Sequence, residues 1–376
     1  MRLKPATLGR PFWRALRRDY LLHVLLAACA ALGVARPAAI RTFPALVDWP
    51  TIAALAGLLV LTKGVEVSGF FHRLGFHLIG FEHSERTVAF FLVASAAALS
   101  TVLTNDVALF IVVPLTLSLR AMATLPIARL VIFEALAVNA GSTLTPVGNP
   151  QNLFLWQRSG SSFHAFVAQM LPLTLILCAV LAVMTALAFS GQRVDAGESE
   201  EPPSLDRRLL ALSVVLYPLF IIAADLHQAL AGLAALLTIF LVVRPSVLRR
   251  VDWLLIAAFV LMFVDLRLIA QTQFVHTLVA RAGLGESSHL YLAGVALAQV
   301  ISNVPAAILL SEHSDDTRLI AYAVDVGGFG LAVGSLANLI ALRMLRRRRA
   351  WLAFHGYSLP FLFAAGGLTW AWLFVA

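Results

Sequence analysis

Two polar stretches that interrupt helix formation recur at matched positions in an otherwise apolar chain. Residues 138–141 read Val-Asn-Ala-Gly, and residues 147–153 read Val-Gly-Asn-Pro-Gln-Asn-Leu. At one fixed interval downstream, residues 324–327 read Val-Asp-Val-Gly and residues 333–339 read Val-Gly-Ser-Leu-Ala-Asn-Leu. A helix opened at such a point frees carbonyl oxygens that can bind a cation, and the half-helix that follows presents a partial positive charge to an anion. Matched breaks of this kind favour the binding site of a transporter.

A second matched pair lies upstream of each break, in the triplets Thr104–Asp106 (Thr-Asn-Asp) and Ser302–Val304 (Ser-Asn-Val). Asparagine and hydroxyl side chains can cap an exposed helix end, and they can also offer oxygen to an ion or a substrate. Asp106 is the most informative of these residues, because an ionisable side chain inside a membrane indicates function by default. We expect Asp106 to bind Na⁺ or to take up a proton. The alternative is that it only caps the helix that follows.

Asp325, which aligns with Asn139 just before the second break, is the next acid expected to take part in coupling. The alternative for Asp325 is a buried acid held by hydrogen bonds. Lys63 and Glu66 are three residues apart, so they favour a local ion pair on one helix face. The chain contains no nucleophile elbow, Walker loop or paired cysteines, and we therefore expect neither an enzyme nor a primary pump.

The composition places these residues in a membrane. Of the 376 residues, 60% are hydrophobic and only 13% are charged, and the mean hydropathy is +0.87. Soluble domains are about 45–50% apolar and about 25% charged. The net charge of +8 is better explained by basic residues that flank apolar spans than by a nucleic-acid partner. Cys29 and Cys178 both lie in apolar segments, which argues against a disulfide framework and a metal site.

Apolar runs bounded by charge, proline or glycine predict membrane-spanning helices, each of which needs about 17–25 residues. The expected crossings lie near 20–36, 46–67, 127–157, 169–190, 207–224, 227–243, 251–269, 317–345 and 357–375. The two segments that the triplets interrupt, 87–121 and 286–311, are instead expected to be re-entrant hairpins with tips near mid-membrane. With the N-terminus in the cytoplasm and the C-terminus outside, most of the 28 Lys and Arg residues fall on the cytoplasmic side, as membrane orientation requires.

The predicted fold class is an all-α polytopic membrane protein with two inverted-topology repeats, each with a re-entrant helical hairpin and a broken transmembrane helix. In chain order, the predicted units are a cytoplasmic basic tail (1–19), repeat 1 (20–190, with its hairpin at 87–121 and its broken helix at 127–157), an acidic linker with an inverting helix (191–226), and repeat 2 (227–376, with its hairpin at 286–311 and its broken helix at 317–345).

Together, the two triplets and the stretches 141–152 and 327–338 resemble the ion transporter superfamily. That group includes divalent anion/sodium symporters, citrate transporters, arsenite/antimonite efflux permeases and sodium/proton antiporters. The resemblance covers nearly the whole chain. It implies that the hairpin tips and the adjacent unwound helices form two sodium sites with the substrate between them.

Carried over residue by residue, the resemblance assigns three groups of ligands. The first cation site would comprise Thr104, Asn105, Gly141, Thr145 and Gly148, with Asp106 as the group that carries or regulates the coupling ion. The second would comprise Ser302, Asn303, Gly327 and Gly334, with Asp325 nearby. Substrate would lie against Asn105 and Asn303. We also expect Asn149 and Ser335, in the two breaks, to contact it.

The triplets depart from the dicarboxylate branch of this group, in which each tip ends in threonine. Val304 removes a hydroxyl from the second site. Asp106 brings a negative charge close to the place where a dianion would rest, so a cation or a proton must offset it. The Thr-Asn-Asp tip is closer to the arsenite-permease and antiporter branches.

We therefore expect a secondary active transporter that moves a small anion, a carboxylate or an oxyanion, across the cytoplasmic membrane and is coupled to Na⁺ or H⁺. A Na⁺/H⁺ antiporter of the same fold is the alternative, and an ion channel fits less well. No cofactor is expected beyond the coupling ion. The expected partners are the anion, the lipid bilayer and, by the resemblance, a second copy of the chain, without nucleic acid.

Overall fold

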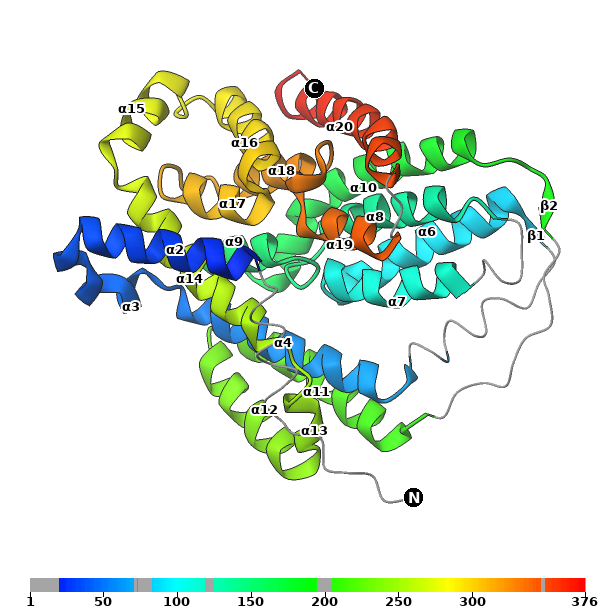
Figure 1. Cartoon of the computed structure of the whole chain (residues 1–376), viewed down its shortest axis with the longest axis horizontal. Coiled ribbons are helices and arrows are strands. Elements are labelled where there is room, and N and C mark those ends of the chain that lie inside the picture. Colours follow the sequence, from blue (N-terminus) through cyan, green and yellow to red (C-terminus); the bar gives the residue numbers. More distant parts are fainter. Residues whose placement is uncertain are drawn as a thin grey trace.

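The computed structural model describes residues 20–70, 73, 83–118, 125–194, 205–345 and 349–375 (Figure 1). In these parts of the chain nearly all regular structure is helical. Strands are confined to a two-residue antiparallel pair, β1 (His83–Ser84) with β2 (Arg193–Val194). The all-α prediction is confirmed. The basic tail at 1–19, the acidic residues 195–204 and the end of the first hairpin at 119–121 lie outside the described residues.

Helices of membrane-spanning length form much of the molecule. Six described helices have at least 18 residues and enough apolar character to cross a membrane: α4 (Trp49–Val67), α6 (Glu85–Val102), α10 (Phe163–Ala188), α11 (Arg207–Asp225), α14 (Trp253–Ala270) and α20 (Ala350–Phe374). Large apolar side chains point outward from several of them, such as Leu187 (82% exposed) on α10 and Phe363 (74% exposed) on α20. Such side chains are stable on a surface that lipid covers. The protein is a multi-pass membrane protein.

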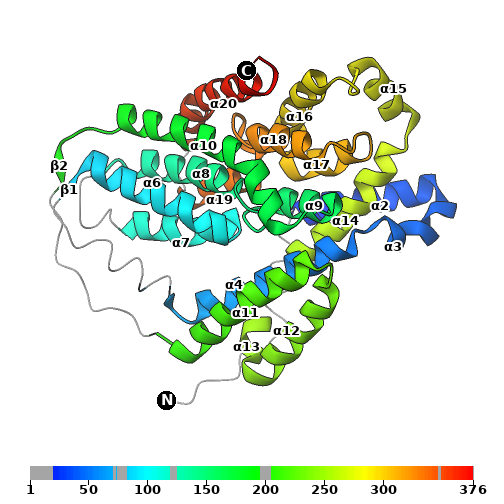
Figure 2. The same cartoon turned by 180° about the vertical axis from the view of Figure 1, so that it is seen from behind.

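Each of the two segments that a triplet interrupts consists of two helices. The triplet lies at their junction and includes the first residues of the second helix. α6 ends at Val102 and α7 (Asn105–Ser118) begins two residues after Leu103, and the two helices contact each other side by side (Figures 1 and 2). α16 (Ser287–Ile301) is followed by Ser302 and then by α17 (Asn303–Ser311), which packs back against it. We call Thr104–Asp106 the first tip and Ser302–Val304 the second tip.

The two predicted helix breaks are present. α8 (Ile127–Ser142) ends before residues 143–149, the first break, and α9 (Pro150–Ser159) follows. Asn149 caps α9 by accepting a hydrogen bond from the amide of Asn152 at 2.8 Å, and Pro150 at the first helical position needs no N–H partner. In the second half, α18 (Thr317–Gly327) ends before residues 328–335, the second break, which contains the 3₁₀ turn η3 (Ala332–Gly334) and leads into α19 (Leu336–Leu345).

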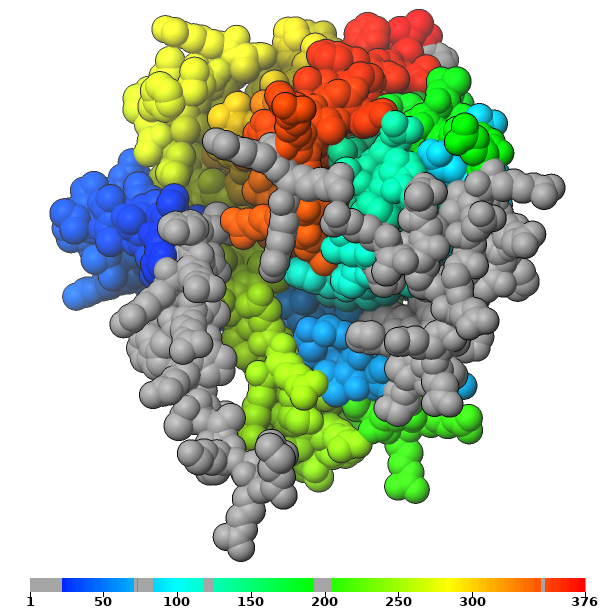
Figure 3. Space-filling model, turned by 45° about the vertical axis from the view of Figure 1, so that its right-hand side comes forward, coloured from blue at the N-terminus to red at the C-terminus, as the bar shows by residue number. Residues whose placement is uncertain are grey.

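The remaining helices frame these elements. They are α2 (Tyr20–Ala35), η1 (Pro37–Thr42), α3 (Phe43–Leu46), α12 (Ala229–Val243), α13 (Pro245–Leu248) and α15 (Gln273–Ala282). α4 packs against α11, α12 and α13, and this group lies below the hairpins in Figure 1. α8 lies at the centre of the other group, in contact with α6, α7, α10 and α19. In Figure 3 the orange and red segments α19 and α20 lie between the yellow second-half helices and the turquoise first half.

Candidate functional site

The carboxylate of Asp325, on the last turns of α18, is held by the start of α9. Its Oδ1 accepts hydrogen bonds from Asn149 Nδ2 at 3.2 Å and from Gln151 Nε2 at 2.9 Å. Its Oδ2 accepts a hydrogen bond from Asn152 Nδ2 at 2.9 Å. Asp325 is only 3% exposed, and a buried carboxylate is stable when donors of this kind satisfy it. A second-half acid is therefore bound by the first half of the chain.

Asn139, the residue that aligns with Asp325, makes the reciprocal contact. Its Nδ2 donates to Asn338 Oδ1 at 2.8 Å, and its Oδ1 accepts a hydrogen bond from Ser335 Oγ at 2.9 Å. Asn338 and Ser335 align in the repeated motif with Asn152 and Asn149. The residue before each break is thus bound by residues at the end of the other break and just after it, and one buried hydrogen-bond network joins the two broken helices.

The first tip packs directly into the first break. The backbone N–H of Asn105 donates to the carbonyl of Gly148 at 2.8 Å, and Thr145 Oγ1 donates to the carbonyl of Thr101 at 2.6 Å. Glycine also lets α8 approach α6 closely beside this contact, because a Cβ on Gly141 would lie 2.0 Å from the carbonyl oxygen of Ala97. Asn105 Nδ2 also reaches Asn139 Oδ1, at 3.5 Å. The first tip is therefore connected to the network between the breaks.

The second tip is bound to the second break in a similar way. Ser302 Oγ donates to the carbonyl of Gly334 at 3.4 Å. Ser302 has a left-handed backbone (φ 74°), which is costly for a residue with a Cβ and is typical of functional sites. A Cβ on Gly328 would lie 3.3 Å from Asn303 Nδ2 and 3.8 Å from the Cβ of Ser335, so these two residues are neighbours. Asn303 Oδ1 accepts the N–H of Val304, just as Asn105 Oδ1 accepts the N–H of Asp106, each at 2.9 Å.

All four residues predicted to contact substrate are buried and lie among the two tips and the two breaks, which together we call the buried layer. The exposed fractions are 4% for Asn105, 3% for Asn303 and 1% each for Asn149 and Ser335. The predicted cation ligands surround the same layer, Thr104, Gly141, Thr145 and Gly148 on the first-half side and Ser302, Gly327 and Gly334 on the second-half side. The assignment of these residues to particular ligands stays a prediction.

A cavity of about 730 Å³ reaches this layer from the surface. Its deep end includes Thr104 and Asp106 of the first tip, and its outer end includes the exposed side chains of Arg249 and Arg250. Lys63 and Glu66 line one side and form the predicted ion pair, with 2.5 Å between Nζ and Oε2. The ion-pair prediction is confirmed, and the cavity connects basic residues at the surface with the polar network inside.

Three helices begin at this cavity. Asp106, Pro150 and Leu336 line it, and they belong to the first turns of α7, α9 and α19. The N-terminus of a helix carries about half an elementary positive charge and presents unpaired N–H groups. Three such ends at one space place partial positive charges beside the carboxylate of Asp106, and partial charges of this kind suit an anion.

Two polar atoms of the first tip have no hydrogen-bond partner in the described structure, Thr104 Oγ1 and Asp106 Oδ1. Thr104 is 5% exposed. Buried polar atoms are nearly always satisfied in folded proteins, so these two oxygens are available to a further group. A hydroxyl oxygen and a carboxylate oxygen are suitable ligands for a hard cation, and the carboxylate is also suitable for a proton.

Sequence reasoning missed several members of the network. Gln151, Asn152 and Asn338 lie inside the repeated motifs, and their amides could have been included on that ground. Glu134, a fully buried acid on α8, accepts a hydrogen bond from Thr116 of α7 and shares none with this network. Gln299 on α16, which contacts the second break, carries no motif that could have identified it.

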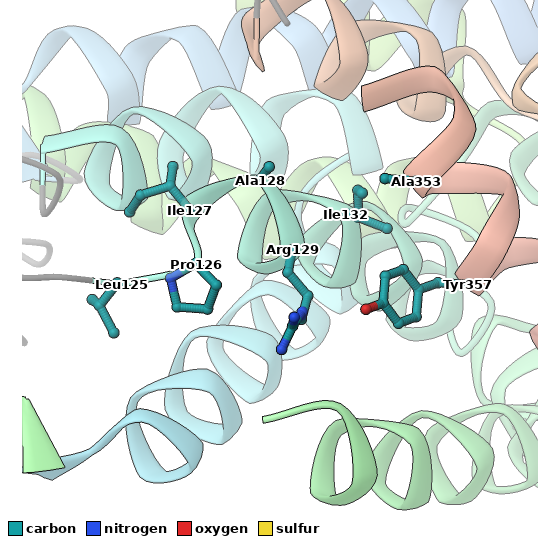
Figure 4. Close-up of a pocket in the computed structure, with 8 residues that line it drawn as sticks. All are labelled: Leu125, Pro126, Ile127, Ala128, Arg129, Ile132, Ala353 and Tyr357. Carbon is teal, nitrogen blue, oxygen red and sulfur yellow. The ribbon is translucent and has the colours of Figure 1, made fainter. Parts of the chain in front are cut away.

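A smaller pocket lies apart from this site, between the start of α8 and α20 (Figure 4). It has a volume of about 350 Å³, and Arg129 and Tyr357 are its polar side chains. Arg129 is already engaged, because it donates to the carbonyl of Ala188 at 2.5 Å and lies over the ring of Phe189. No predicted site residue lines this pocket.

Comparison with known proteins gives consistent matches along the chain. The citrate transporter family matches residues 12–314. Inner membrane protein YbiR of Escherichia coli (strain K12) is 44% identical, over 94% of this chain and 95% of that protein. Uncharacterized transporter MJ0456 of Methanocaldococcus jannaschii is 28% identical, over 80% and 82%. Among solved structures, the YdaH transporter of Alcanivorax borkumensis matches 94% of this chain and 97% of its own with a TM-score of 0.50 at 14% identity, which bears on the fold alone.

Proposed function

The chain belongs to the citrate transporter family, and on that premise we propose that it is a secondary active transporter that moves a small anion, a carboxylate or an oxyanion, across the cytoplasmic membrane. Membrane transport, rather than enzyme chemistry, is the activity class that family membership supports. The anion and its coupling to Na⁺ or H⁺ are the parts that we propose.

The single observation that carries the proposal is the cavity at which α7, α9 and α19 begin. An anion at its deep end would face three helix N-termini. Arg249 and Arg250 at the outer end would raise the local concentration of anions and speed their entry, because exposed charges steer diffusing ligands.

Asp106 provides the link to a coupling ion. Its side chain lines the same cavity as the three helix ends, so a bound anion would meet a negative charge there. Binding of Na⁺ by Asp106 and Thr104, or protonation of Asp106, removes that repulsion. The cation or proton and the anion then increase each other's affinity, because coupling between two sites is reciprocal.

The direction of the cavity follows from the charge distribution in the sequence. Arg249 and Arg250 fall on the cytoplasmic side when the N-terminus is cytoplasmic and the C-terminus is outside. The cavity then opens to the cytoplasm. In alternating access, the group of helices around α8 would move against the group around α4. This movement would close the opening and expose the buried layer to the other side of the membrane.

The proposal is tested by uptake measurements with purified protein in proteoliposomes. A panel of carboxylates and oxyanions is offered with a Na⁺ gradient, with a pH gradient, or with neither. We expect saturable uptake of at least one anion that a cation gradient accelerates. Uptake that fails to saturate would indicate a channel instead.

A matched pair of variants locates the route. Leu336→Trp replaces a leucine of the cavity lining by a larger aromatic side chain, and Leu352→Trp makes the same change at an exposed site on α20. We expect Leu336→Trp to abolish uptake and Leu352→Trp to retain it. Full uptake by Leu336→Trp would show that the cavity is not the route of the anion.

The second candidate function is Na⁺/H⁺ exchange without an organic substrate. The observation in its favour is that three neutral amides hold the carboxylate of Asp325 and that Asp106 Oδ1 has no hydrogen-bond partner in the described structure. Proton movement driven by a Na⁺ gradient in the absence of any transported anion would support this function over anion transport.

A further inference from the structure

The side chain of Gln299 forms hydrogen bonds with carbonyl groups that lack helical partners at the second break. Its Nε2 donates to the carbonyl of Gly327 at 2.6 Å and to the carbonyl of Phe329 at 2.9 Å. Its Oε1 accepts the backbone N–H of Leu331 at 2.8 Å. One amide on α16 therefore satisfies three backbone groups on both sides of the point where α18 ends.

The corresponding position of the first half is different. Gln299 lies four residues before Asn303, and Thr101 lies four residues before Asn105. The hydroxyl of Thr101 donates to the carbonyl of Ala98 in its own helix at 2.8 Å, so it does not reach the first break. Gly141, which aligns with Gly327, has its carbonyl bonded by backbone N–H groups, including that of Leu144 at 3.2 Å.

The two halves also differ in their unsatisfied oxygens. The first tip contains Thr104 Oγ1 and Asp106 Oδ1, both buried and without a partner. Within the described residues of the second tip and second break, no buried side-chain oxygen or nitrogen lacks a partner. Ser302, which aligns with Thr104, donates to the carbonyl of Gly334, and Val304 replaces the acid.

An amide N–H and a cation compete for the same carbonyl lone pairs. The carboxamide NH₂ of Gln299 supplies two donors in the place where a cation would otherwise collect these oxygens, but it carries no net charge and cannot be exchanged. We propose that Gln299 permanently substitutes for a cation in the second half, so that only the first tip binds a coupling ion. This inference rests on the proposed function, because it assigns the number of ions that drive the transport.

The proposal revises the expectation of a second sodium site at Ser302, Asn303, Gly327 and Gly334. In this chain the residues of that set serve to hold the second break closed. One coupling ion then enters and leaves per cycle, at Thr104 and Asp106, and the break of the second half stays in a fixed conformation.

The sharpest test converts the internal donor into an acceptor. In Gln299→Glu, the carboxylate cannot donate to the carbonyls of Gly327 and Phe329, and the clustered oxygens need a cation instead. Gln157→Glu is the matched control, because Gln157 also donates its amide to a backbone carbonyl, that of Ala224 at 3.3 Å, and it lies outside this cluster. Binding of ²²Na⁺ to the purified proteins measures the number of ions per chain, and thermal unfolding in Na⁺ or in choline reports the same ions through stability.

We expect the wild type to bind at most one Na⁺ per chain. Gln299→Glu should bind one more than the wild type and gain a Na⁺-dependent rise in Tm, whereas Gln157→Glu should match the wild type. Two Na⁺ ions bound by the wild type would overturn the proposal, as would unchanged stoichiometry in folded Gln299→Glu. If Gln299→Glu does not fold, the wild-type stoichiometry decides alone.

This test is separate from the test of the proposed function. Sodium binding is measured without any anion, so a protein that transports no anion can still gain a Na⁺ site in Gln299→Glu. Conversely, coupled anion uptake with two ions bound to the wild type would leave the proposed function intact and reject the role of Gln299.

Discussion

Asn139 and Asp325 align with each other before the two helix breaks, yet each side chain is bound by the opposite half of the chain. Asp325 accepts three amide N–H donors from the start of α9, and Asn139 is bound by Ser335 and Asn338. The two sides use aligned positions, but Asp325 is a carboxylate that accepts three donors, whereas Asn139 is an amide that both donates and accepts. The two broken helices therefore depend on each other for their hydrogen bonds, and the charge makes their interface asymmetric.

This relationship predicts that Asp325→Asn destabilises the protein and reduces transport. An asparagine at position 325 retains one acceptor and turns an NH₂ group toward the donors of Asn149, Gln151 or Asn152. Charge-assisted hydrogen bonds contribute about 1.5–3 kcal/mol each, so we expect a loss on the order of 2 kcal/mol and a lower Tm in detergent. The control is Asp315→Asn, at a fully exposed carboxylate, which should leave Tm unchanged. Equal Tm values for both variants would contradict the role of Asp325.

The close packing of α8 against α6, the helix that precedes the first tip, predicts a severe effect of Gly141→Ala. The added Cβ would lie 2.0 Å from the carbonyl oxygen of Ala97, and a backbone atom of a packed helix cannot move away easily. Overpacking of this kind costs typically 1–3 kcal/mol and sometimes more. Gly367→Ala is the matched control, because that helical glycine has nothing within 4 Å of an added Cβ. Thermal unfolding should show a clear loss for Gly141→Ala and little change for Gly367→Ala.

A pH effect is expected outside the membrane-spanning segments, at His313. Burial lowers the pKa of His313, and the charge of His276 lowers it further, whereas Glu312 opposes the shift. The two rings are in edge contact at 5.8 Å between centroids. Because the folded pKa lies below the unfolded value of about 6.5, the unfolded state binds the proton more readily, and stability falls as the pH drops below that value.

Measurement of Tm between pH 8 and pH 5 checks this expectation. His313→Gln should lose part of the acid-induced fall in Tm, and His164→Gln, at an exposed histidine, should follow the wild type. If all three curves coincide, His313 does not contribute to the acid sensitivity.

The sequence was sufficient for the features that depend on local chemistry. Glycine and proline in 141–150 predict an interrupted helix, and a helix break is present there. The spacing of Lys63 and Glu66 predicts their ion pair, which is also present. The contact of Gln151 with Asp325 joins residues far apart in the chain, and no spacing rule specifies such a partner. Gln299 has no motif at all, because its role depends on how α16 packs against the second break.

Other expectations from the sequence stay predictions. The assignment of individual residues to Na⁺ or to substrate depends on bound ligands, and the homodimer depends on a second copy of the chain. The orientation of the termini rests on the distribution of Lys and Arg. What the fold adds is the convergence of the predicted substrate residues Asn105, Asn303, Asn149 and Ser335 in one buried layer.

The basic residues at the outer end of the cavity predict an effect on affinity rather than on turnover. Replacing both Arg249 and Arg250 by glutamine removes two positive charges that attract an anion to the opening. We expect the apparent KM to rise by a factor on the order of ten at low ionic strength, because steering effects of this kind span about 10 to 10³. Added salt should reduce the difference from the wild type, since it screens exposed charges. Arg281→Gln on α15, at an arginine outside the cavity, should leave KM unchanged.

Asp106→Asn tests whether the coupling ion acts at the first tip. The amide keeps the size of the side chain but cannot hold a proton or balance a bound Na⁺. We expect anion binding to persist, because the repulsion between the carboxylate and the anion is gone, while the acceleration of uptake by a Na⁺ or pH gradient is lost. Counterflow, in which labelled anion exchanges against unlabelled anion without a cation gradient, should therefore survive.

The comparison with Asp315→Asn distinguishes loss of coupling from general damage, because that substitution makes the same chemical change at an exposed carboxylate and should retain gradient-driven uptake. The combination of intact counterflow and absent gradient dependence is specific to a coupling role, since a purely structural cap at the start of α7 would reduce both together. If Asp106→Asn keeps the Na⁺ and pH dependence of the wild type, the coupling ion binds elsewhere, and the unpaired oxygens of Thr104 and Asp106 serve another purpose.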